Sequence, residues 1–261
     1  MNQIHDHLVE DRRDAVAVLR VDREAALGAL STGMVHALGD YLAALAHDSS
    51  VRVLVLTGTG KGFIAGADIG EYHGVTTPEF DAYQRLSRDV FTSLESLPQI
   101  TIAAVNGYAL GGGFEVTLCC DVILASDRAR FGLPEVKLGL LPGGGGTQRL
   151  SRSAGVRFAT EAVITGRLIG PDELHQRGVV SRVCSAAELN ARAVELADQV
   201  VRNPPLAVSA AKPLIRAAAE LELEQGLTLE HDVLLKLFGS EDAAEGISAF
   251  VNKRAARFVG R

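Results

Sequence analysis

Two isolated glutamates are the residues of this chain best suited to acid–base chemistry. Glu115 is the single charged side chain between Gln99 and Cys120, and it follows closely on three glycines. Glu135 lies in a second apolar stretch, 131–136. Burial disfavours an ionised carboxylate and raises its pKa, which lets the group exchange protons near neutral pH. Together the two residues suggest an acid–base pair, whereas either one alone is better explained as a loop residue on the surface.

Glycines beside these carboxylates could supply backbone hydrogen-bond donors. Gly112 and Gly113 open a predicted helix, and the first N–H groups of a helix are free to point at an anion. Beside Glu115 such donors could hold an oxyanion. The run Gly143–Gly146 lacks the lysine of a phosphate loop, and neither glycine run has dinucleotide-binding spacing. The alternative for both runs is a tight turn or close backbone packing.

Alternating strand and helix patterns must position these motifs. Apolar, β-branched runs that end in turn residues predict strands, and apolar residues at helical spacing predict helices. The expected strands are 15–21, 51–57, 100–105, 121–125 and 129–131. The expected helices are one capped by Ser31 or Thr32 with apolar positions from 34 to 45, and 78–97, 113–119, 144–150, 156–165, 171–176 and 186–200. Runs buried on both faces favour an α/β architecture.

The clearest break in the chain is Asn203-Pro204-Pro205. Only helical patterns follow it, including a helix at 241–250 with Ser240 as its N-cap. We therefore expect a core at 1–203 and a C-terminal helical region at 204–261, which packs on the core or on a neighbouring subunit.

Composition narrows the functional class. A net charge of −6 argues against general nucleic-acid binding. The first twenty residues hold several charges and no apolar run, and the segment 100–120 contains Asn106 and Glu115, so neither a secretory signal nor a membrane span is expected. Three cysteines without a CxxC motif favour reduced thiols and a cytoplasmic location.

The histidines give little support to a metal site or a hydrolytic triad. They are scattered along the chain, apart from His5 and His7, which we expect in a frayed terminus. No metal is therefore predicted. Two carboxylates also serve in glycosidases, but a chain without tryptophan is a poor candidate for that class.

Four segments resemble the enoyl-CoA hydratase/isomerase, or crotonase, superfamily. They are FIAGADI at 63–69, NGYALGGGFE at 106–115, FGLPEVKLGLLPGGGGTQRL at 131–150 and EGISAFVNKR at 245–254. The resemblance implies a spiral of ββα turns with a C-terminal helical oligomerisation region, assembled as a trimer or as a hexamer made of two trimers. It also implies an acyl-CoA thioester as substrate, with no metal or redox cofactor.

The resemblance further assigns roles to individual residues. The N–H groups of Ala65 and Gly112 would form an oxyanion hole, and the N–H of Gly143 would orient a water molecule. Glu115 would act as base and Glu135 would deliver a proton to Cα. Residues implied to contact CoA are Ala65, Gly66, Ala67, Asp68 and Ile69, with Phe250 and Lys253 of the tail reaching the nucleotide end, often from a neighbouring subunit.

Retention of both glutamates favours an enoyl-CoA hydratase, a lyase of the kind used in fatty-acid β-oxidation. One alternative is an enoyl-CoA isomerase, in which Glu115 would be dispensable, or another acyl-CoA lyase of the superfamily. The other is a non-catalytic acyl-CoA-binding protein. Acyl preference should depend on the loop 71–77 and on the helix that bears Phe80, Tyr83 and Phe91.

Overall fold

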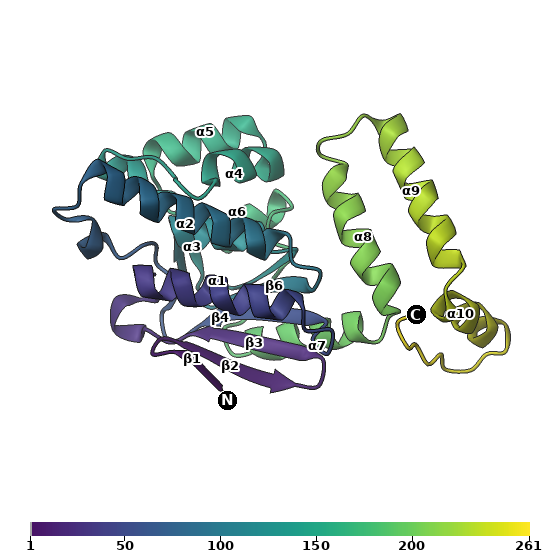
Figure 1. Ribbon diagram of the computed structural model, residues 1–261. Helices are drawn as coiled ribbons and strands as arrows, with labels where there is room; N and C mark the ends of the chain where they lie inside the picture. Colours follow the sequence, from purple (N-terminus) through teal and green to yellow (C-terminus); the bar gives the residue numbers. More distant parts are fainter. Residues whose placement is uncertain (1) are drawn as a thin grey trace.

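The computed structural model describes residues 2–261, which form two sheets surrounded by helices (Figure 1). The larger sheet contains, in spatial order, β1 (Asn2–His5), β2 (Leu8–Arg13), β3 (Val16–Val21), β4 (Val53–Gly58), β6 (Ile100–Val105), β8 (Val122–Ser126) and β10 (Arg182–Cys184). The smaller sheet contains β5 (Gly62–Ile64), β7 (Tyr108–Leu110) and β9 (Arg130–Gly132). From β3 to β10 the larger sheet is parallel, as is the smaller sheet.

The chain winds through both sheets as a spiral. The strand pairs β4 and β5, β6 and β7, and β8 and β9 each place one strand in the larger sheet and the next in the smaller one. The first two pairs lead into α2 (Thr77–Glu95) and α3 (Gly112–Cys119), and the third leads into a 3₁₀ turn at Glu135–Leu138 and α4 (Gly146–Ala154). The expected spiral of ββα turns is confirmed.

The remaining helices of the core are α1 (Thr32–Ala46), α5 (Val156–Thr165), α6 (Pro171–Gln176) and α7 (Leu189–Val201). They are followed by the tail helices α8 (Pro205–Ala217), α9 (Leu223–Phe238) and α10 (Glu241–Val251). Ser31 caps α1 by accepting from the N–H of Met34, and a reciprocal capping box of Thr76 and Glu79 starts α2. The apolar core between α1, α2, α3 and the sheets carries the site, whereas α7 closes the opposite face.

The structure corrects the expectation of a frayed N-terminus around His5 and His7. The antiparallel strands β1 and β2 enclose a turn that contains His7, and β2 pairs with β3 along its whole length. Glu10 of β2 is buried and accepts a hydrogen bond of 2.8 Å from the Tyr41 hydroxyl of α1. Charged residues fill most of β2, so its sequence lacks the apolar alternation that reveals a strand.

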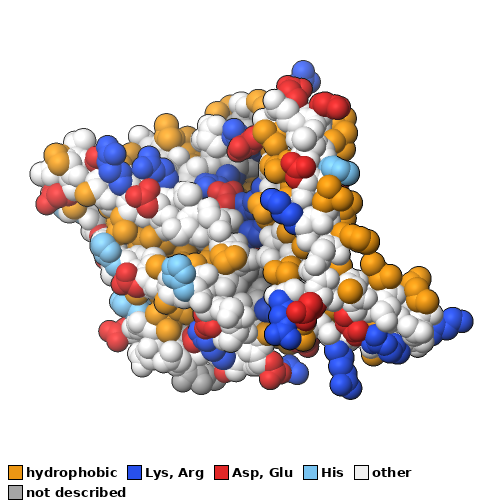
Figure 2. All heavy atoms as spheres, turned by 45° about the vertical axis from the view of Figure 1, so that its right-hand side comes forward, with side chains coloured by type: hydrophobic (Ala, Val, Ile, Leu, Met, Phe, Trp, Pro, Cys, Tyr) orange, Lys and Arg blue, Asp and Glu red, His pale blue; other side chains and the backbone are white. Residues whose placement is uncertain are grey.

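The tail helices stand beside the core (Figure 1). Helix α8 is fixed to the core by Lys212, whose buried ammonium donates to the carbonyl of Gln99 at 2.9 Å. Helix α9 buries none of its residues in this chain. Figure 2 shows hydrophobic side chains gathered along this tail, and those of α9 that are exposed are Leu223, Leu227, Leu229, Leu234, Leu235 and Phe238.

Candidate active site

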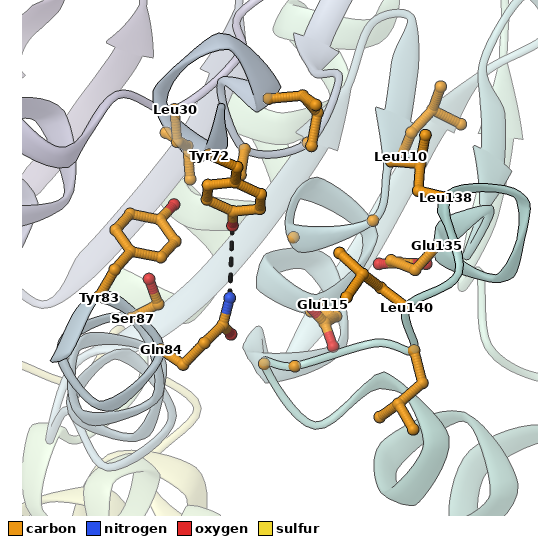
Figure 3. Close-up of a pocket in the computed structure, with 18 of the residues that line it drawn as sticks. Leu30, Tyr72, Tyr83, Gln84, Ser87, Leu110, Glu115, Glu135, Leu138 and Leu140 are labelled. Carbon is orange, nitrogen blue, oxygen red and sulfur yellow. Dashed lines mark hydrogen bonds between the residues drawn. The ribbon is translucent and has the colours of Figure 1, made fainter. Parts of the chain in front are cut away.

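A cavity of about 350 Å³ lies where the smaller sheet, α2 and α3 meet (Figure 3). Loops after β5, β7 and β9 supply most of its lining, and α2 supplies one wall. The lining includes Leu30, Ala65, Gly66, Ala67, Ile69, Tyr72, Phe80, Tyr83, Gln84, Ser87, Phe91, Leu110, Gly111, Gly112, Glu115, Pro134, Glu135, Leu138, Leu140, Leu141, Gly143 and Gly144. Both predicted carboxylates therefore enter one cavity, although they come from different turns of the spiral.

Glu115 lies in the first turn of α3 and is only 2% exposed. Its position is fixed by Gly146, whose N–H donates to Oε1 at 2.7 Å. Burial raises the pKa of Glu115, and hydrogen bonds from the backbone of Gly146 and Gly144 oppose that rise. Glu115 is thus a buried carboxylate that the backbone of the glycine loop holds in place.

Glu135 begins the 3₁₀ turn that follows β9. Burial raises its pKa to about 7, with a further rise from the charge of Glu115. Its Oε2 is buried and has no hydrogen-bond partner within the described residues. A carboxyl group in this state can hold a proton near neutral pH and give it to a substrate atom.

Two glycines leave room for the carboxylates. A Cβ at Gly111 would lie 2.9 Å from Oε1 of Glu135, and one at Gly144 would lie 2.7 Å from Oε2 of Glu115. Gly111 also has φ 48°, a backbone conformation that disfavours a side chain. The glycine runs therefore serve to bring the backbone close to both acids.

Backbone donors face the same part of the cavity at Ala67 and Gly112. The N–H of Leu30 donates to Gly66 and the N–H of Asp68 donates to Leu30, both at 2.8 Å. These bonds flank Ala67 and turn its own N–H away from Leu30. That nitrogen would lie 4.0 Å from a Cβ at Gly112. Within residues 2–261, no backbone carbonyl accepts from the N–H of Ala67 or Gly112.

The structure contradicts the expectation that Ala65 supplies an oxyanion donor. The N–H of Ala65 donates to the carbonyl of Leu27 at 3.1 Å. It is therefore not free for a ligand, although Ala65 does line the cavity. The motif alone could not distinguish the two alanines of Ala65-Gly66-Ala67, because the partner of Ala65 comes from a loop distant in sequence.

The other predicted contact residues divide into two groups. Gly66, Ala67, Ile69 and Gly143 line the cavity, whereas Asp68 turns aside and pairs with Arg23 at 2.8 Å. Phe250 and Lys253 lie in the tail and are not part of the cavity lining, and Phe250 is 87% exposed.

Sequence reasoning missed Gly146 and the polar wall of α2. Gly146 stands at the end of a glycine run that looks uniform in sequence, so its contact with Glu115 is visible only in three dimensions. Tyr72, Gln84 and Ser87 carry polar groups to the cavity (Figure 3), yet their spacing in sequence is ordinary for a helix and its preceding turn.

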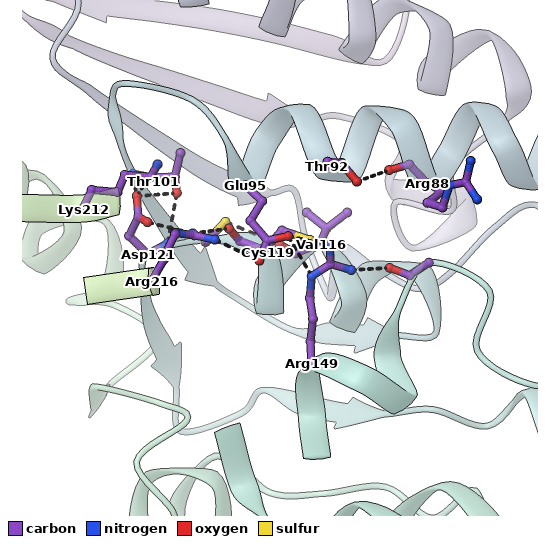
Figure 4. A network of polar contacts seen from close by, with 12 residues as sticks. Arg88, Thr92, Glu95, Thr101, Val116, Cys119, Asp121, Arg149, Lys212 and Arg216 are labelled. Carbon is purple, nitrogen blue, oxygen red and sulfur yellow. Dashed lines mark hydrogen bonds and ion pairs between the residues drawn. The ribbon is translucent and has the colours of Figure 1, made fainter. Parts of the chain in front are cut away.

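An ion-pair network holds the glycine loop 143–146 in place (Figure 4). Arg149 of α4 donates from one terminal nitrogen to the carbonyl of Gly144 at 2.7 Å. Its Nε donates to Glu95 of α2 at 3.1 Å. The positive charge of Arg149 also lowers the pKa of Glu115, against the larger effect of burial. Arg149 therefore ties the loop beside Glu115 to α2.

The network continues into the tail. Arg216 of α8 pairs with Glu95 and with Asp121, both at 2.8 Å. Lys212, one turn earlier, pairs with the other oxygen of Asp121 at 2.8 Å. The first tail helix is thus connected, through Glu95 and Arg149, to the loop that holds Glu115.

No helix within residues 2–261 is long and apolar enough to cross a membrane. The same residues contain no group of three or more His, Cys, Asp or Glu side chains placed to hold a metal ion.

This geometry suits proton transfer at a substrate whose carbonyl develops negative charge. Two carboxyl groups of raised pKa and two free backbone N–H groups share one largely apolar cavity. Backbone donors in such a site stabilise an oxyanion without reorganising.

Comparison with known proteins identifies the family. The model of the enoyl-CoA hydratase/isomerase family matches residues 11–261. The chain is 41% identical to 2,3-dehydroadipyl-CoA hydratase of Escherichia coli K12, over 97% of this chain and 99% of that protein. It is 38% identical to short-chain-enoyl-CoA hydratase of Clostridium acetobutylicum, over 95% and 96% respectively.

Solved structures agree. The crystal structure of an enoyl-CoA hydratase from Bacillus anthracis superposes with a TM-score of 0.95 at 35% identity, covering 98% of this chain and all of that one. Because both the family model and the relatives span nearly the whole length, the chain belongs to the enoyl-CoA hydratase/isomerase family.

Proposed function

We propose that this protein is an enoyl-CoA hydratase, which adds water reversibly to a 2-enoyl-CoA thioester to give a 3-hydroxyacyl-CoA. The observation that carries the proposal is the pairing of Glu115 and Glu135, both with raised pKa values, in a cavity that also presents the N–H groups of Ala67 and Gly112. The hydratase names of the relatives support the same activity.

The reaction follows from the charges that must move. Water attacks Cβ, and Glu115 takes its proton. Electrons shift to the thioester oxygen, where the N–H groups of Ala67 and Gly112 stabilise the negative charge. Glu135 then gives a proton to Cα, so the enzyme ends with one proton on the pair, as it began. Because the two acids interact, they titrate as a pair.

Ala67 replaces Ala65 in this proposal, since only Ala67 has a free N–H. The segment 65–69 would still carry CoA along its backbone, and Gly143 at the cavity wall would help to orient the water. Phe250 and Lys253 lie in the tail, outside the cavity lining, and would reach CoA bound in a neighbouring subunit.

Assembly into a trimer or a hexamer belongs to the same proposal. An exposed apolar helix such as α9 is costly in water, and burial against other subunits would relieve that cost. No further cofactor is needed, because CoA is part of the substrate.

Turnover of crotonyl-CoA in water enriched in oxygen-18 tests the proposal. We expect loss of the enoyl-thioester absorbance and a 3-hydroxybutyryl-CoA that carries the heavy oxygen at C3. A 3-enoyl-CoA offered in parallel separates the alternatives. Rapid conversion of that ester to the 2-enoyl isomer, without hydration of crotonyl-CoA, would establish an isomerase instead. Binding without any turnover would establish an acyl-CoA-binding protein.

A further inference from the structure

The wall of the cavity formed by α2 and the preceding turn carries four side chains with polar groups. Tyr72, Tyr83, Gln84 and Ser87 all line the cavity, and Figure 3 shows their polar atoms facing one another. Gln84 donates from Nε2 to the Tyr72 hydroxyl at 3.3 Å. The two catalytic glutamates of the proposed mechanism lie elsewhere in the cavity, on α3 and after β9.

Ser87 is the residue of this wall with an unmet hydrogen bond. It is only 5% exposed, and its Oγ has no hydrogen-bond partner within residues 2–261. Tyr83 is its neighbour on this wall (Figure 3), and the interaction with Ser87 lowers the pKa of Tyr83 against the larger effect of burial, although the contact does not meet hydrogen-bond geometry. A buried hydroxyl without a partner destabilises a fold, so its presence in a ligand cavity points to a group that the ligand supplies.

The charged residues that line the cavity limit the chemistry of the ligand group that could bond to Ser87. No lysine, arginine or histidine belongs to its described lining, whereas Glu115 and Glu135 do. The adjoining hollow over α2, outside this lining, adds Glu71, Glu79 and His36. A carboxylate carried into the cavity itself would be desolvated beside Glu115 and Glu135 without a cationic partner in the lining.

The rest of the lining suits an alkyl segment. Leu30, Leu138, Leu140 and Leu141 contribute apolar surface to the same cavity. An acyl chain can therefore place its methylene groups against apolar side chains while its end meets the polar wall.

We infer that the cavity selects 2-enoyl-CoA esters whose acyl chain ends in an uncharged hydrogen-bonding group, a hydroxyl or a carbonyl, which Ser87 and its neighbours on α2 recognise. This inference rests on the proposed hydratase function and specifies its substrate class. It differs from the dicarboxylic acyl group in the name of the Escherichia coli relative, since this cavity offers no cation for a second carboxylate.

The test compares hydration of three matched esters: 2-hexenoyl-CoA, 6-hydroxy-2-hexenoyl-CoA and 2,3-dehydroadipyl-CoA. Shorter and longer ω-hydroxy esters are run beside them, so that the chain length that reaches the wall is found rather than assumed. For the length that fits, we expect kcat/KM for the hydroxy ester to exceed that for the alkyl ester by about tenfold, with the carboxylate ester lowest. Preference for the alkyl or the carboxylate ester at every length would overturn the inference.

Variants assign the preference to the wall. Ser87→Ala should bring the hydroxy and alkyl esters to within about twofold of each other, chiefly by raising KM for the hydroxy ester. Ser93→Ala is the matched control, because Ser93 lies on the same helix, is exposed, and bonds only to the carbonyl of Asp89. An unchanged preference in Ser87→Ala would contradict the assignment, and thermal unfolding confirms that each variant folds.

A binding measurement without turnover distinguishes failure of this inference from failure of the proposed function. Calorimetric titration with hexanoyl-CoA and 6-hydroxyhexanoyl-CoA, which cannot be hydrated, reports recognition without turnover. Tighter binding of the hydroxy ester, lost in Ser87→Ala, would sustain the inference even if no ester were hydrated. Equal binding of the two esters at every chain length would overturn it even in an active hydratase.

Discussion

At the scale of single residues, burial is the main cause of the raised pKa of both Glu115 and Glu135, yet their surroundings differ. Glu115 accepts from Gly146 and lies within reach of the positive charge of Arg149, both of which favour its ionised form. Glu135 has an unpartnered buried oxygen and the negative charge of Glu115 nearby, both of which favour its protonated form. Environment thus assigns the base to Glu115 and the acid to Glu135.

Glu135→Gln should stabilise the fold at alkaline pH, because the native state holds the Glu135 proton more tightly than the unfolded chain does. Its pKa rises from 4.5 to about 7 on folding. Below pH 4.5 both states are protonated, and Glu135 does not change the free energy of unfolding. As pH rises from 4.5 to 7 the unfolded state gains relative stability, and above 7 the penalty is complete.

Denaturation in urea at pH 5 and pH 8 measures this effect. Partial exposure of Glu135 screens its charge, so we expect Glu135→Gln to raise the unfolding free energy at pH 8 by about 1–2 kcal/mol, and by less at pH 5. A variant that is equally or less stable than the wild type at pH 8 would contradict the environment described for Glu135.

At the scale of elements, the N-terminus of α3 joins a carboxylate to a free donor. Gly112 is the first residue of α3, and Glu115 follows within its first turn. Proline is well tolerated at a first helical position but has no N–H. Gly112→Pro should therefore lower kcat by roughly 100- to 1,000-fold while the helix persists.

Gly112→Ala serves as the comparison, because it keeps the N–H and its Cβ would make ordinary contacts, the nearest at 3.8 Å to Phe91. Its kcat should fall far less than that of Gly112→Pro. Circular dichroism checks that both variants keep their helices. Equal losses in the two variants would show that the N–H of Gly112 is not an oxyanion donor.

Helix α4 holds the glycine loop through Arg149, which donates to the carbonyl of Gly144. The positive charge of Arg149 lowers the pKa of Glu115. Arg149→Met should raise the pKa of Glu115. The base must be ionised to act, so the acid limb of the kcat/KM profile should move to higher pH. Arg149→Lys, which keeps the charge, should restore part of the shift. Arg152→Met on the same helix is the exposed control, and an unmoved limb in Arg149→Met would refute the coupling.

The elements that sequence predicted are those with long apolar runs. β4, β6, α2 and α3 bury continuous apolar faces, so periodicity revealed them. The three-residue strands β5, β7 and β10 could not be predicted, because their pairing depends on partners from other turns of the spiral.

In the candidate site too, some features are visible as local sequence patterns, and others depend on contacts between segments distant in sequence. Glu115 and Glu135 were visible as isolated charges in apolar sequence, and the structure brings both into one cavity. The choice between the Ala65 and Ala67 donors depends on which N–H bonds to Leu27, a contact across sequence. The unpartnered hydroxyl of Ser87 likewise depends on burial by other elements, which no local pattern encodes.

At the scale of the whole molecule, the tail presents an apolar surface to solvent. Phe238 is 70% exposed and Leu234, one turn before it on α9, is 60% exposed. We expect the wild type to sediment as a trimer or hexamer, and the double variant Leu234→Asp with Phe238→Asp to yield smaller species. Lys236→Ala on the same helix should leave the mass unchanged. A monomeric wild type at micromolar concentration would show that α9 is not an assembly surface.

The most direct test of the central claim is the hydration rate of crotonyl-CoA in Glu115→Gln and Glu135→Gln. Each variant keeps the size of its side chain and loses the ability to exchange a proton. We expect kcat to fall by at least about 100-fold in both, with little change in KM, while the exposed control Glu224→Gln of α9 stays at the wild-type rate. Near wild-type turnover in either glutamate variant would contradict hydration by a pair of carboxyl groups.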